Sequence, residues 1–439
     1  MAPKKKILIL SYFFPPCNLT PSERLLSFAR YLPEGGYEPV VITRTWSHPI
    51  RNATTDIFLP GGETVEVERN GDYEVHYVPY RQNLRDRLFV NLYGKKAYPL
   101  YLVVAFFWNP LQLFFFRMSC CWHLYRYARH FLRQHPEFRL LLVSVAPFEL
   151  LGMANRLSRR FGLQWMADYR DDWSTNEMQY ADSLPKRLLN LLYARIERHW
   201  MKSASFFSTV SEPYREKLAA FLHKDGVTVA NGFMAPLPEP EPLFPEFTVV
   251  YLGSLYGAQP IERFLEGYKQ WLDESPRKAR LIFVGIGGEP PIRKRVEVAL
   301  KGYETHFTVT PRLSKNEALR MQQKAHALLA IGYEGKKGIP GSKLYDYIQT
   351  KKPVILFPTD GDILESTLSA TGQALICSGP EEVRAMLNTL YTRFSEGLAD
   401  AGVDIPENLY QSFSRAYQCR QMTDAMHRHF TSSSNTPAA

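Results

Sequence analysis

The stretch KILILSYFFPPCNLTPSERLLSFARYLPEGGYEPVVIT, residues 6–43, indicates how the chain begins to fold. It opens with an apolar run that is typical of a buried strand in a parallel sheet. Apolar residues then recur at helical spacing from Leu25 to Leu32, and the Gly35-Gly36 pair ends that helix before a second apolar run. Strand, helix and strand in this order form a βαβ unit, whose crossover we expect to be right-handed.

The composition is that of a globular protein with several buried cores. The chain has 439 residues, enough for two or three domains of ordinary size, and 45% of them are hydrophobic. Its formal charge of +9 suits an anionic ligand or an anionic membrane surface. No arginine-rich tract or aromatic RNA-binding motif occurs, so no nucleic-acid partner is expected. Five cysteines without CxxC spacing predict buried thiols rather than disulfides or a zinc site.

The first residues imitate a secretory signal peptide, because three lysines precede the apolar run. The run from Ile7 to Leu10 is too short for the hydrophobic region of such a peptide. We therefore interpret it as the first strand and expect the protein to be cytoplasmic.

A proline-rich stretch separates two halves that each alternate strands and helices. Residues 231–246, NGFMAPLPEPEPLFPE, hold five prolines and no hydrophobic periodicity, which is typical of a linker. Two such halves predict two doubly wound α/β domains facing a cleft, with ligands beyond the carboxyl ends of the strands. The predicted parts are a first domain at 1–232, a linker at 233–246, a second domain at 247–405, a C-terminal segment at 406–430 with one helix over 407–430, and a disordered tail at 431–439.

Residues 98–122, YPLYLVVAFFWNPLQLFFFRMSCCW, hold many aromatic and aliphatic side chains but are interrupted by polar ones. A spanning helix needs about 20 mostly apolar residues, and the Asn109-Pro110 step falls mid-span. Three alternatives remain: a buried helix pair, an interfacial segment that dips into a bilayer, and a transmembrane helix. In the interfacial case the protein would contact the anionic inner face of the cell membrane peripherally, helped by Lys95, Lys96, Arg117, Arg126 and Arg129.

The stretch GIPGSKLYDYIQTKKPVIL, residues 338–356, predicts a helix whose N-terminus binds an anion. Ser342 is the expected cap, and Lys343 takes the first helical position, where the helix dipole disfavours a cation. A diphosphate held by the N-terminal N–H groups, Ser342 and Lys343 would resolve that conflict. Asp346, one turn further on, could accept hydrogen bonds from ribose hydroxyls. The alternative is an exposed lysine that forms an i,i+3 salt bridge.

Polar residues also follow other predicted strands. In VVYLGSLYG, Gly253 and Ser254 could bind phosphate through free N–H groups, although most glycines at strand ends only turn the chain. In ADYRDDW, Arg170 and Asp171 could bind hydroxyl groups, orient a substrate or pair with each other. Arg24, in the loop after the first strand, could reach a phosphate or an acceptor, or that loop could be a rigid proline turn.

Other familiar motifs are missing from the sequence. Neither GxGxxG nor GxxxxGK[ST] occurs, so neither a nicotinamide site nor a P-loop is predicted. TDGD, residues 359–362, is similar to an Asp-x-Asp metal motif, but a turn and a helix cap explain it here. We therefore expect neither a bound metal nor a cofactor.

Taken together, these stretches resemble the nucleotide-sugar glycosyltransferases of the GT-B fold, close to family 4. DYRDDW is similar to DFRDPW, the signature of a bacterial subgroup that acts in surface-polysaccharide assembly. The preceding SVAPFELLGMANRLSRRFGLQW resembles the strand end and helix of that subgroup. STVSEPYREKL, VANGF, VVYLGSLYG and IPGSKLYDYIQTKKPVIL follow in the order of the family, so the likeness covers nearly the whole chain.

The resemblance implies two Rossmann-like domains, with a C-terminal helix that crosses back to the first. It implies transfer of a sugar, with retention and without a protein-bound metal, from a nucleotide-diphosphate donor to a glycan or polyprenyl-linked acceptor in cell-surface polysaccharide synthesis. The second domain would bind the donor and the first the acceptor. By position, the donor-binding residues would be Gly253, Ser254, Arg312, Ser342, Lys343 and Asp346. The acceptor side would hold Arg24 and Asp171, and the catalytic residues would be Arg170, Asp171 and Lys343.

The chain departs from the family pattern in two places. Family 4 often carries two glutamates eight positions apart; here Asp346 takes the second position and Gly338 the first. The usual basic pair after the first strand of the donor domain is reduced to Arg263. A nucleotide-sugar epimerase of the same fold and a catalytically silent binding or scaffold subunit are therefore alternative functions.

Overall fold

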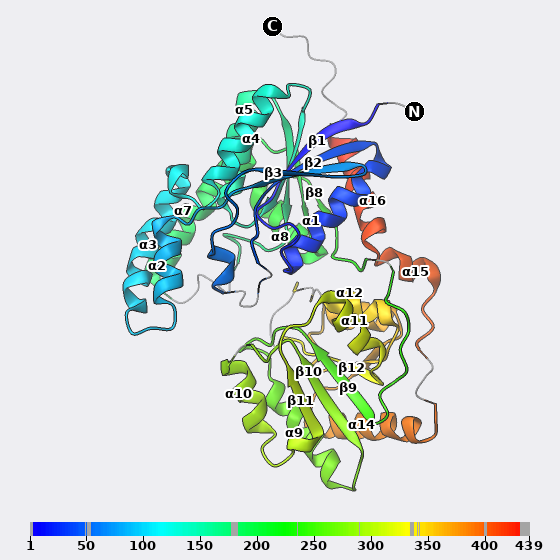
Figure 1. Ribbon diagram of the computed structural model, residues 1–439. Helices are drawn as coiled ribbons and strands as arrows, with labels where there is room; N and C mark the ends of the chain where they lie inside the picture. Colours follow the sequence, from blue (N-terminus) through cyan, green and yellow to red (C-terminus); the bar gives the residue numbers. More distant parts are fainter. Residues whose placement is uncertain are drawn as a thin grey trace. The chain divides into compact units, whose positions relative to one another are not determined.

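The computed structural model describes residues 3–48, 50, 54–176, 183–234, 236–288, 290–333, 338–339, 341, 343–398 and 402–430. The predicted cap Ser342 and the predicted tail at 431–439 lie outside these residues. The chain divides into two compact units, one of Met1–Ala230 with Gln418–Ala439 and one of Asn231–Tyr417 (Figure 1).

The first unit is built on an eight-stranded sheet with the order β3-β4-β2-β1-β5-β6-β7-β8. β1 pairs in parallel with β2 on one side and with β5 on the other, so the strand order reverses at β1. β3 pairs with β4 as an antiparallel hairpin at one edge. The strands are β1 (Lys5–Leu10), β2 (Tyr37–Arg44), β3 (Glu66–Asn70), β4 (Tyr73–Val78), β5 (Leu140–Val145), β6 (Gln164–Tyr169), β7 (Phe206–Thr209) and β8 (Gly226–Thr228).

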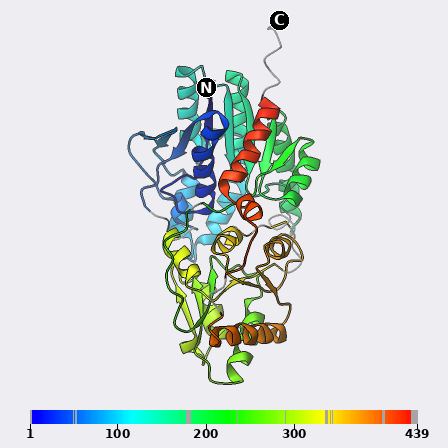
Figure 2. The same cartoon turned by 90° about the vertical axis from the view of Figure 1, so that its right-hand side faces the viewer.

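Helices cover both faces of this sheet, because alternate residues of β1 enter two different cores. Ile7 and Ile9 share a core with α1 and α16, whereas Leu8 and Leu10 share one with α4, α5, α7 and α8. Figure 2 shows α16, in red, beside α1, in dark blue. The helices are α1 (Thr20–Tyr31), α2 (Leu84–Leu92), α3 (Tyr98–Phe114), α4 (Trp122–Gln134), α5 (Glu149–Phe161), α7 (Leu184–Met201), α8 (Glu212–Leu222) and α16 (Arg415–Phe430).

The C-terminal helix returns to the first unit, as the resemblance implies. A Cβ on Gly35 would collide with the Thr423 side chain, so glycine is what allows α16 to approach the chain before β2. The expectation of one helix over 407–430 is wrong, because α15 (Glu407–Ser412) and α16 are separate helices. The break falls at Phe413 and Ser414, and Ser414 forms an isolated parallel bridge with Phe233.

The second unit is built on a six-stranded parallel sheet with the order β11-β10-β9-β12-β13-β14. The strand order reverses at β9, which lies between β10 and β12. The strands are β9 (Phe247–Leu252), β10 (Ala279–Val284), β11 (Phe307–Thr310), β12 (Ala327–Ala330), β13 (Val354–Leu356) and β14 (Ala374–Ile376). The helices are α9 (Ile261–Asp273), α10 (Pro290–Ala299), α11 (Lys315–Gln323), α12 (Lys343–Thr350), α13 (Ile363–Ala370) and α14 (Pro380–Ser395). Together the two sheets confirm the predicted doubly wound α/β fold class.

The apolar stretch at 98–122 does not form a buried helix pair, so that alternative is wrong. α3 contains Pro110, a short 3-10 helix over Phe116–Met118 follows it, and α4 begins at Trp122. Seven apolar residues of α3 are 44–61% exposed. No helix within the described part of the chain is long and apolar enough to cross a membrane.

Candidate functional site

The predicted donor loop and the predicted anion-binding helix meet at the carboxyl edge of the second sheet. Gly253 follows β9 with a φ of +111°, in the region that favours glycine, and its N–H donates to the Val284 carbonyl at 2.9 Å. The Lys343 Cγ would lie 3.4 Å from a Cβ placed on Gly253. The aliphatic part of Lys343, the first residue of α12, therefore covers the backbone of this loop.

Tyr347, the fifth residue of α12, attaches this helix to two strands. Its hydroxyl donates to the Leu329 carbonyl at 3.0 Å and accepts from the Leu252 N–H at 3.0 Å. Burial raises the pKa of this hydroxyl well above its ordinary value, so the group stays neutral and can both donate and accept. Because Leu252 ends β9 and Leu329 lies in β12, these two bonds fix α12 beside two neighbouring strands.

Asp346 lies between two lysines. Its side chain is 5% exposed, and its Oδ1 is 2.5 Å from the Lys315 Nζ. Its Oδ2 is 3.9 Å from the Lys343 Nζ, which is the i,i+3 salt bridge that the sequence left as an alternative. Lys315 was not among the predicted site residues, although a signal was available. It follows the cap Ser314 and so takes the first position of α11, where the dipole disfavours a cation, as Lys343 does in α12.

This cluster concentrates positive charge at two helix N-termini. Two lysines and one carboxylate leave one net positive charge, and the dipoles of α11 and α12 add to it. The two helices pack against each other (Figure 1). Such a site suits a ligand with several anionic oxygens, for example a diphosphate, which would compete with Asp346 for the lysine ammonium groups.

The other predicted donor residues lie around this cluster or outside the described residues. Ser254 is exposed, and its carbonyl accepts from the Tyr251 hydroxyl at 2.8 Å. Arg312 is exposed in the loop after β11, three residues before Lys315. Ser342 lies outside the described residues. The contacts of these three residues with a donor stay predictions.

The backbone conformation of Gly338 favours glycine. Gly338 has a φ of +79°, where a glutamate would be strained, and its N–H donates to the Asp362 carboxylate. The glutamate of the family pattern would therefore need a different backbone conformation at this position. Nearby, the Asp360 carboxylate accepts from the N–H groups of Leu364 at 2.9 Å and Glu365 at 3.1 Å. This confirms the interpretation of TDGD as a turn and a helix cap.

In the first unit, the DYRDDW loop leaves β6 and presents two of its charges at the surface. Arg170 and Asp171 form an ion pair with each other, and the Asp171 side chain is 52% exposed. The next residue is anchored, because the Asp172 carboxylate is 3.2 Å from the Lys217 Nζ. Trp173 is buried and stacks on the Phe148 ring at a centroid distance of 4.9 Å. Arg170 and Asp171 therefore directly precede two anchored residues, Asp172 and Trp173. Their contact with an acceptor stays a prediction.

The position of Arg24 does not fit the predicted acceptor contact. Its side chain is 1% exposed and forms a bidentate ion pair with Asp168. The guanidinium also donates to the carbonyls of Val229 at 2.8 Å and Ala230 at 3.3 Å. Because these contacts all lie inside the first unit, Arg24 joins α1 to the ends of two strands instead of lining a surface.

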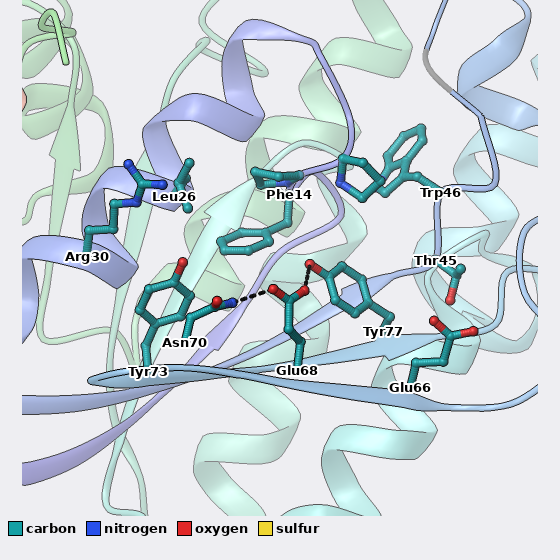
Figure 3. Close-up of a pocket in the computed structure, with 12 residues that line it drawn as sticks. Phe14, Leu26, Arg30, Thr45, Trp46, Glu66, Glu68, Asn70, Tyr73 and Tyr77 are labelled. Carbon is teal, nitrogen blue, oxygen red and sulfur yellow. Dashed lines mark hydrogen bonds between the residues drawn. The ribbon is translucent and has the colours of Figure 1, made fainter. Parts of the chain in front are cut away.

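A pocket of about 490 Å³ lies between α1 and the β3–β4 hairpin (Figure 3). Near its centre, the Glu68 carboxylate accepts from Asn70 Nδ2 at 2.6 Å and from the Tyr77 hydroxyl at 3.2 Å. Aromatic faces and carboxylates together suit a ligand rich in hydroxyl groups. The period-2 alternation of the two strands could have identified this face. The lining includes Phe14, Pro15 and Pro16 of the early loop, with Arg30, Trp46, Glu66 and Tyr73.

No protein-family profile matches the sequence, and no curated protein sequence matches it. The fold, by contrast, matches solved structures over nearly the whole chain. Sucrose-phosphate synthase from Thermosynechococcus elongatus is 15% identical with a TM-score of 0.60, and the match covers 98% of this chain and 100% of that one. HepE from Anabaena, solved with UDP and glucose, is 13% identical with a TM-score of 0.59, and the match covers 97% and 100%.

A structure of HepE with UDP-glucose also matches, at a TM-score of 0.59. A putative UDP-N-acetylglucosamine 2-epimerase from Listeria monocytogenes is 11% identical with a TM-score of 0.51, and the match covers 100% of both chains. At these identities the matches show the fold alone, which is GT-B-like.

Proposed function

We propose that the protein is a glycosyltransferase that takes a sugar from a nucleotide-diphosphate donor bound to its second unit. The observation that carries this proposal is the cluster of Lys315, Lys343 and Asp346 beside Gly253, at the N-termini of α11 and α12. In a GT-B fold this edge of the second sheet is where a donor diphosphate would be bound. The structures of HepE with UDP and with UDP-glucose support a donor of that class.

The cluster suits the departure of a nucleoside diphosphate. As the glycosidic bond breaks, negative charge builds on the diphosphate, and fixed cations and N–H dipoles lower that barrier. Lys343 and Lys315 would supply the cations, with the loop at Gly253 and Ser254 close to the phosphates. Asp346 would exchange its lysine partners for ribose hydroxyls. These residues need no metal for this step, and we propose transfer without one and with retention of configuration.

The acceptor is proposed to bind the first unit. The DYRDDW resemblance supports a glycan or polyprenyl-linked acceptor in cell-surface polysaccharide synthesis, with Arg170 and Asp171 at the acceptor side. The pocket at Glu68 offers aromatic faces and carboxylates to such a hydroxyl-rich ligand. A lipid-linked acceptor would require peripheral contact with the membrane, and the exposed apolar residues of α3 support that contact.

Donor binding tests the proposal directly. UDP, GDP, ADP and TDP, each with and without an attached sugar, are titrated against the full chain by thermal shift. At least one should raise the melting temperature, and Lys343→Ala should weaken that shift. Lys343→Ala should also lower turnover by about 10²–10³-fold. Lys301→Ala is the matched control, because exposed Lys301 precedes β11 and so lies at the opposite edge of the sheet. Normal binding and turnover by Lys343→Ala would refute the assignment.

A nucleotide-sugar epimerase is the second candidate, favoured by the match to the Listeria protein. Incubation of the donor without any acceptor separates the two functions. An epimerase converts the sugar while it stays on the nucleotide, whereas a transferase at most hydrolyses the donor slowly. A chain that binds no nucleotide sugar at all would instead be a scaffold subunit.

A further inference from the structure

The solvent-exposed side of α3 is apolar, whereas a surface helix usually carries polar residues on that side. Its buried side holds Ala105, Gln112 and Leu113. Its exposed side also consists of apolar residues, which together form one patch. Contiguous apolar patches on a protein surface mark interaction sites. The exposed residues are Leu100, Leu102, Val103, Phe106, Phe107, Leu111 and Phe114, and Phe115 continues the patch beyond the helix with 61% exposure.

The geometry of α3 fits a helix that lies on a bilayer. Its 17 residues correspond to a length of about 25 Å. That is shorter than the hydrocarbon core, which is about 30 Å thick. In the first unit α3 packs beside α2 (Figure 1). A helix with one side packed on protein and the other side apolar can bury its outer side at the boundary between headgroups and acyl chains.

The charges around α3 select an anionic surface. Residues 87–136 contain no Asp or Glu and seven Lys or Arg residues. Lys95 and Lys96 precede α3, and Arg117 follows it by three residues. A second copy of the chain is a poor occupant of this face, because symmetrical pairing would bring two such cationic segments together. The cations of the segment are Arg87, Lys95, Lys96, Arg117, Arg126, Arg129 and Arg133.

Three of these arginines converge on one groove next to the end of α3. Arg117, Trp122, Arg126 and Arg129 line a groove of about 480 Å³. Trp122, Arg126 and Arg129 recur at i, i+4 and i+7 and so share one side of α4. The Arg117 guanidinium lies 5.8 Å from the centre of the Trp122 ring. Within the described part of the chain, Arg117, Arg126 and Arg129 form no ion pair with a carboxylate at 4.0 Å or less.

We propose that this face is a docking site for an anionic phospholipid bilayer, in which α3 inserts its exposed phenylalanines and the Arg117–Arg126–Arg129 groove binds the phosphate of a lipid headgroup. This inference rests on the membrane contact in the proposed function, and it adds a binding site for the lipid phosphate. Guanidinium groups bind phosphate oxygens in bidentate fashion, and the Trp122 ring is suited to the interface. Arg117, which directly follows Phe115 and Phe116, brings the headgroup site to the end of the inserted helix.

Vesicle flotation of the full chain tests this inference. Vesicles are made of phosphatidylcholine alone or of phosphatidylcholine and phosphatidylglycerol in equal amounts. The protein should bind the anionic vesicles and leave the neutral ones. The double variant Arg126→Gln/Arg129→Gln should lose about thirtyfold in affinity, since each basic residue near the surface contributes about 1 kcal/mol. Its matched control is Arg420→Gln/Arg428→Gln, which removes the same charge from exposed positions of α16, on the opposite face of the first sheet from α4, and should change affinity by less than about threefold.

Insertion is tested by Phe107→Ser/Phe114→Ser, whose side chains are 61% and 52% exposed and so can change without unfolding the helix. We expect this variant to lose vesicle binding, and Val298→Ser, which alters a 65% exposed residue of α10, to keep it. Equal losses of vesicle affinity in the two arginine double variants would contradict the assignment of the groove as the headgroup site. Unchanged binding by the phenylalanine variant, or concentration-dependent dimers without vesicles, would overturn the docking face. Binding of soluble glycerol phosphate as tight as that of vesicles would overturn the lipid assignment.

Nucleotide binding without vesicles separates this inference from the proposed transferase. The arginine and phenylalanine variants should bind the nucleotide as well as the unmodified chain does. A chain that binds vesicles but no nucleotide would refute the transferase and leave the docking site standing. A chain that binds nucleotide but no vesicle would refute the docking site and leave the transferase standing.

Discussion

The Arg24 guanidinium and the Asp168 carboxylate form a buried bidentate ion pair, with Nε–Oδ2 and Nη2–Oδ1 distances of 2.9 and 2.7 Å. The pair joins α1 to β6, and the Ser208 hydroxyl on β7 donates to the same carboxylate at 2.7 Å. Asp168 is the first residue of DYRDDW. The ion pair therefore fixes the strand end from which Arg170 and Asp171 emerge, so its effect on a ligand would be indirect.

Removing one partner of this pair should destabilise the first unit. Arg24→Met leaves the Asp168 carboxylate buried without its countercharge, which typically costs about 3–5 kcal/mol. Urea unfolding of the full chain measures the loss. Lys6→Met is the control, because the Lys6–Glu137 pair has side chains 39% and 44% exposed and such pairs contribute about 1 kcal/mol or less. Equal, small effects of the two substitutions would contradict the structural role of Arg24.

Lys315 should contribute to nucleotide binding, although it lies in α11 and is therefore separated in the sequence from Lys343 and Asp346 of α12. A charge-assisted hydrogen bond is worth about 1.5–3 kcal/mol, so Lys315→Met should weaken UDP or related nucleotide binding by about 10–100-fold. Isothermal titration calorimetry measures the change. Lys324→Met is the matched control, since Lys324 follows the same helix and pairs with Glu241 at 3.2 Å. If both variants bind nucleotide alike, Lys315 only neutralises Asp346.

The sequence predicts the local elements well because hydrophobic periodicity is a local signal. The run before Ser11 and the spacing from Leu25 to Leu32 were enough to predict β1 and α1. Lys343 was found because a cation at the start of a helix conflicts with the dipole. Lys315 shows the same conflict but was missed, because the capping box at Ser314 already explained that helix start.

Long-range partners are what the sequence could not supply. Arg24 and Asp168 are 144 residues apart, and nothing local to either one indicates that they meet. Asp346 likewise finds Lys315 across 31 residues. Burial is equally non-local: the residues of α3 are as apolar as a core helix, and only the packing of the rest of the unit shows which of them stay exposed.

The cysteines should be inert in the folded protein. All five are buried, and burial raises the pKa of the Cys377 and Cys419 thiols to about 12. The thiolate is the reactive form, so at pH 8 its fraction at these two sites is about 10⁻⁴, compared with about a quarter for a free cysteine. Labelling by a chromogenic disulfide should therefore be slow at pH 8 and become complete in urea. Rapid labelling of the native chain would contradict this burial.

Gly253 and Gly257 offer a paired test of the donor loop. Gly253 has a φ of +111°, so Gly253→Ala forces an L side chain into a strained conformation. The added Cβ would also touch the Lys343 side chain, with Cγ at 3.4 Å and Cε at 3.5 Å. Because the strain falls on the contact between the loop and Lys343, we expect weaker nucleotide binding together with a stability loss of about 1–2 kcal/mol.

Gly257→Ala is the control for that substitution, because a Cβ there meets nothing within 4 Å and Gly257 is not among the glycines with positive φ. It should leave nucleotide affinity and the melting temperature nearly unchanged. The two measurements separate two explanations of the loop. If Gly253→Ala lowers the melting temperature but leaves nucleotide affinity intact, the glycine only turns the chain after β9. If both quantities fall in Gly253→Ala alone, the close approach of this backbone to Lys343 is part of the donor site.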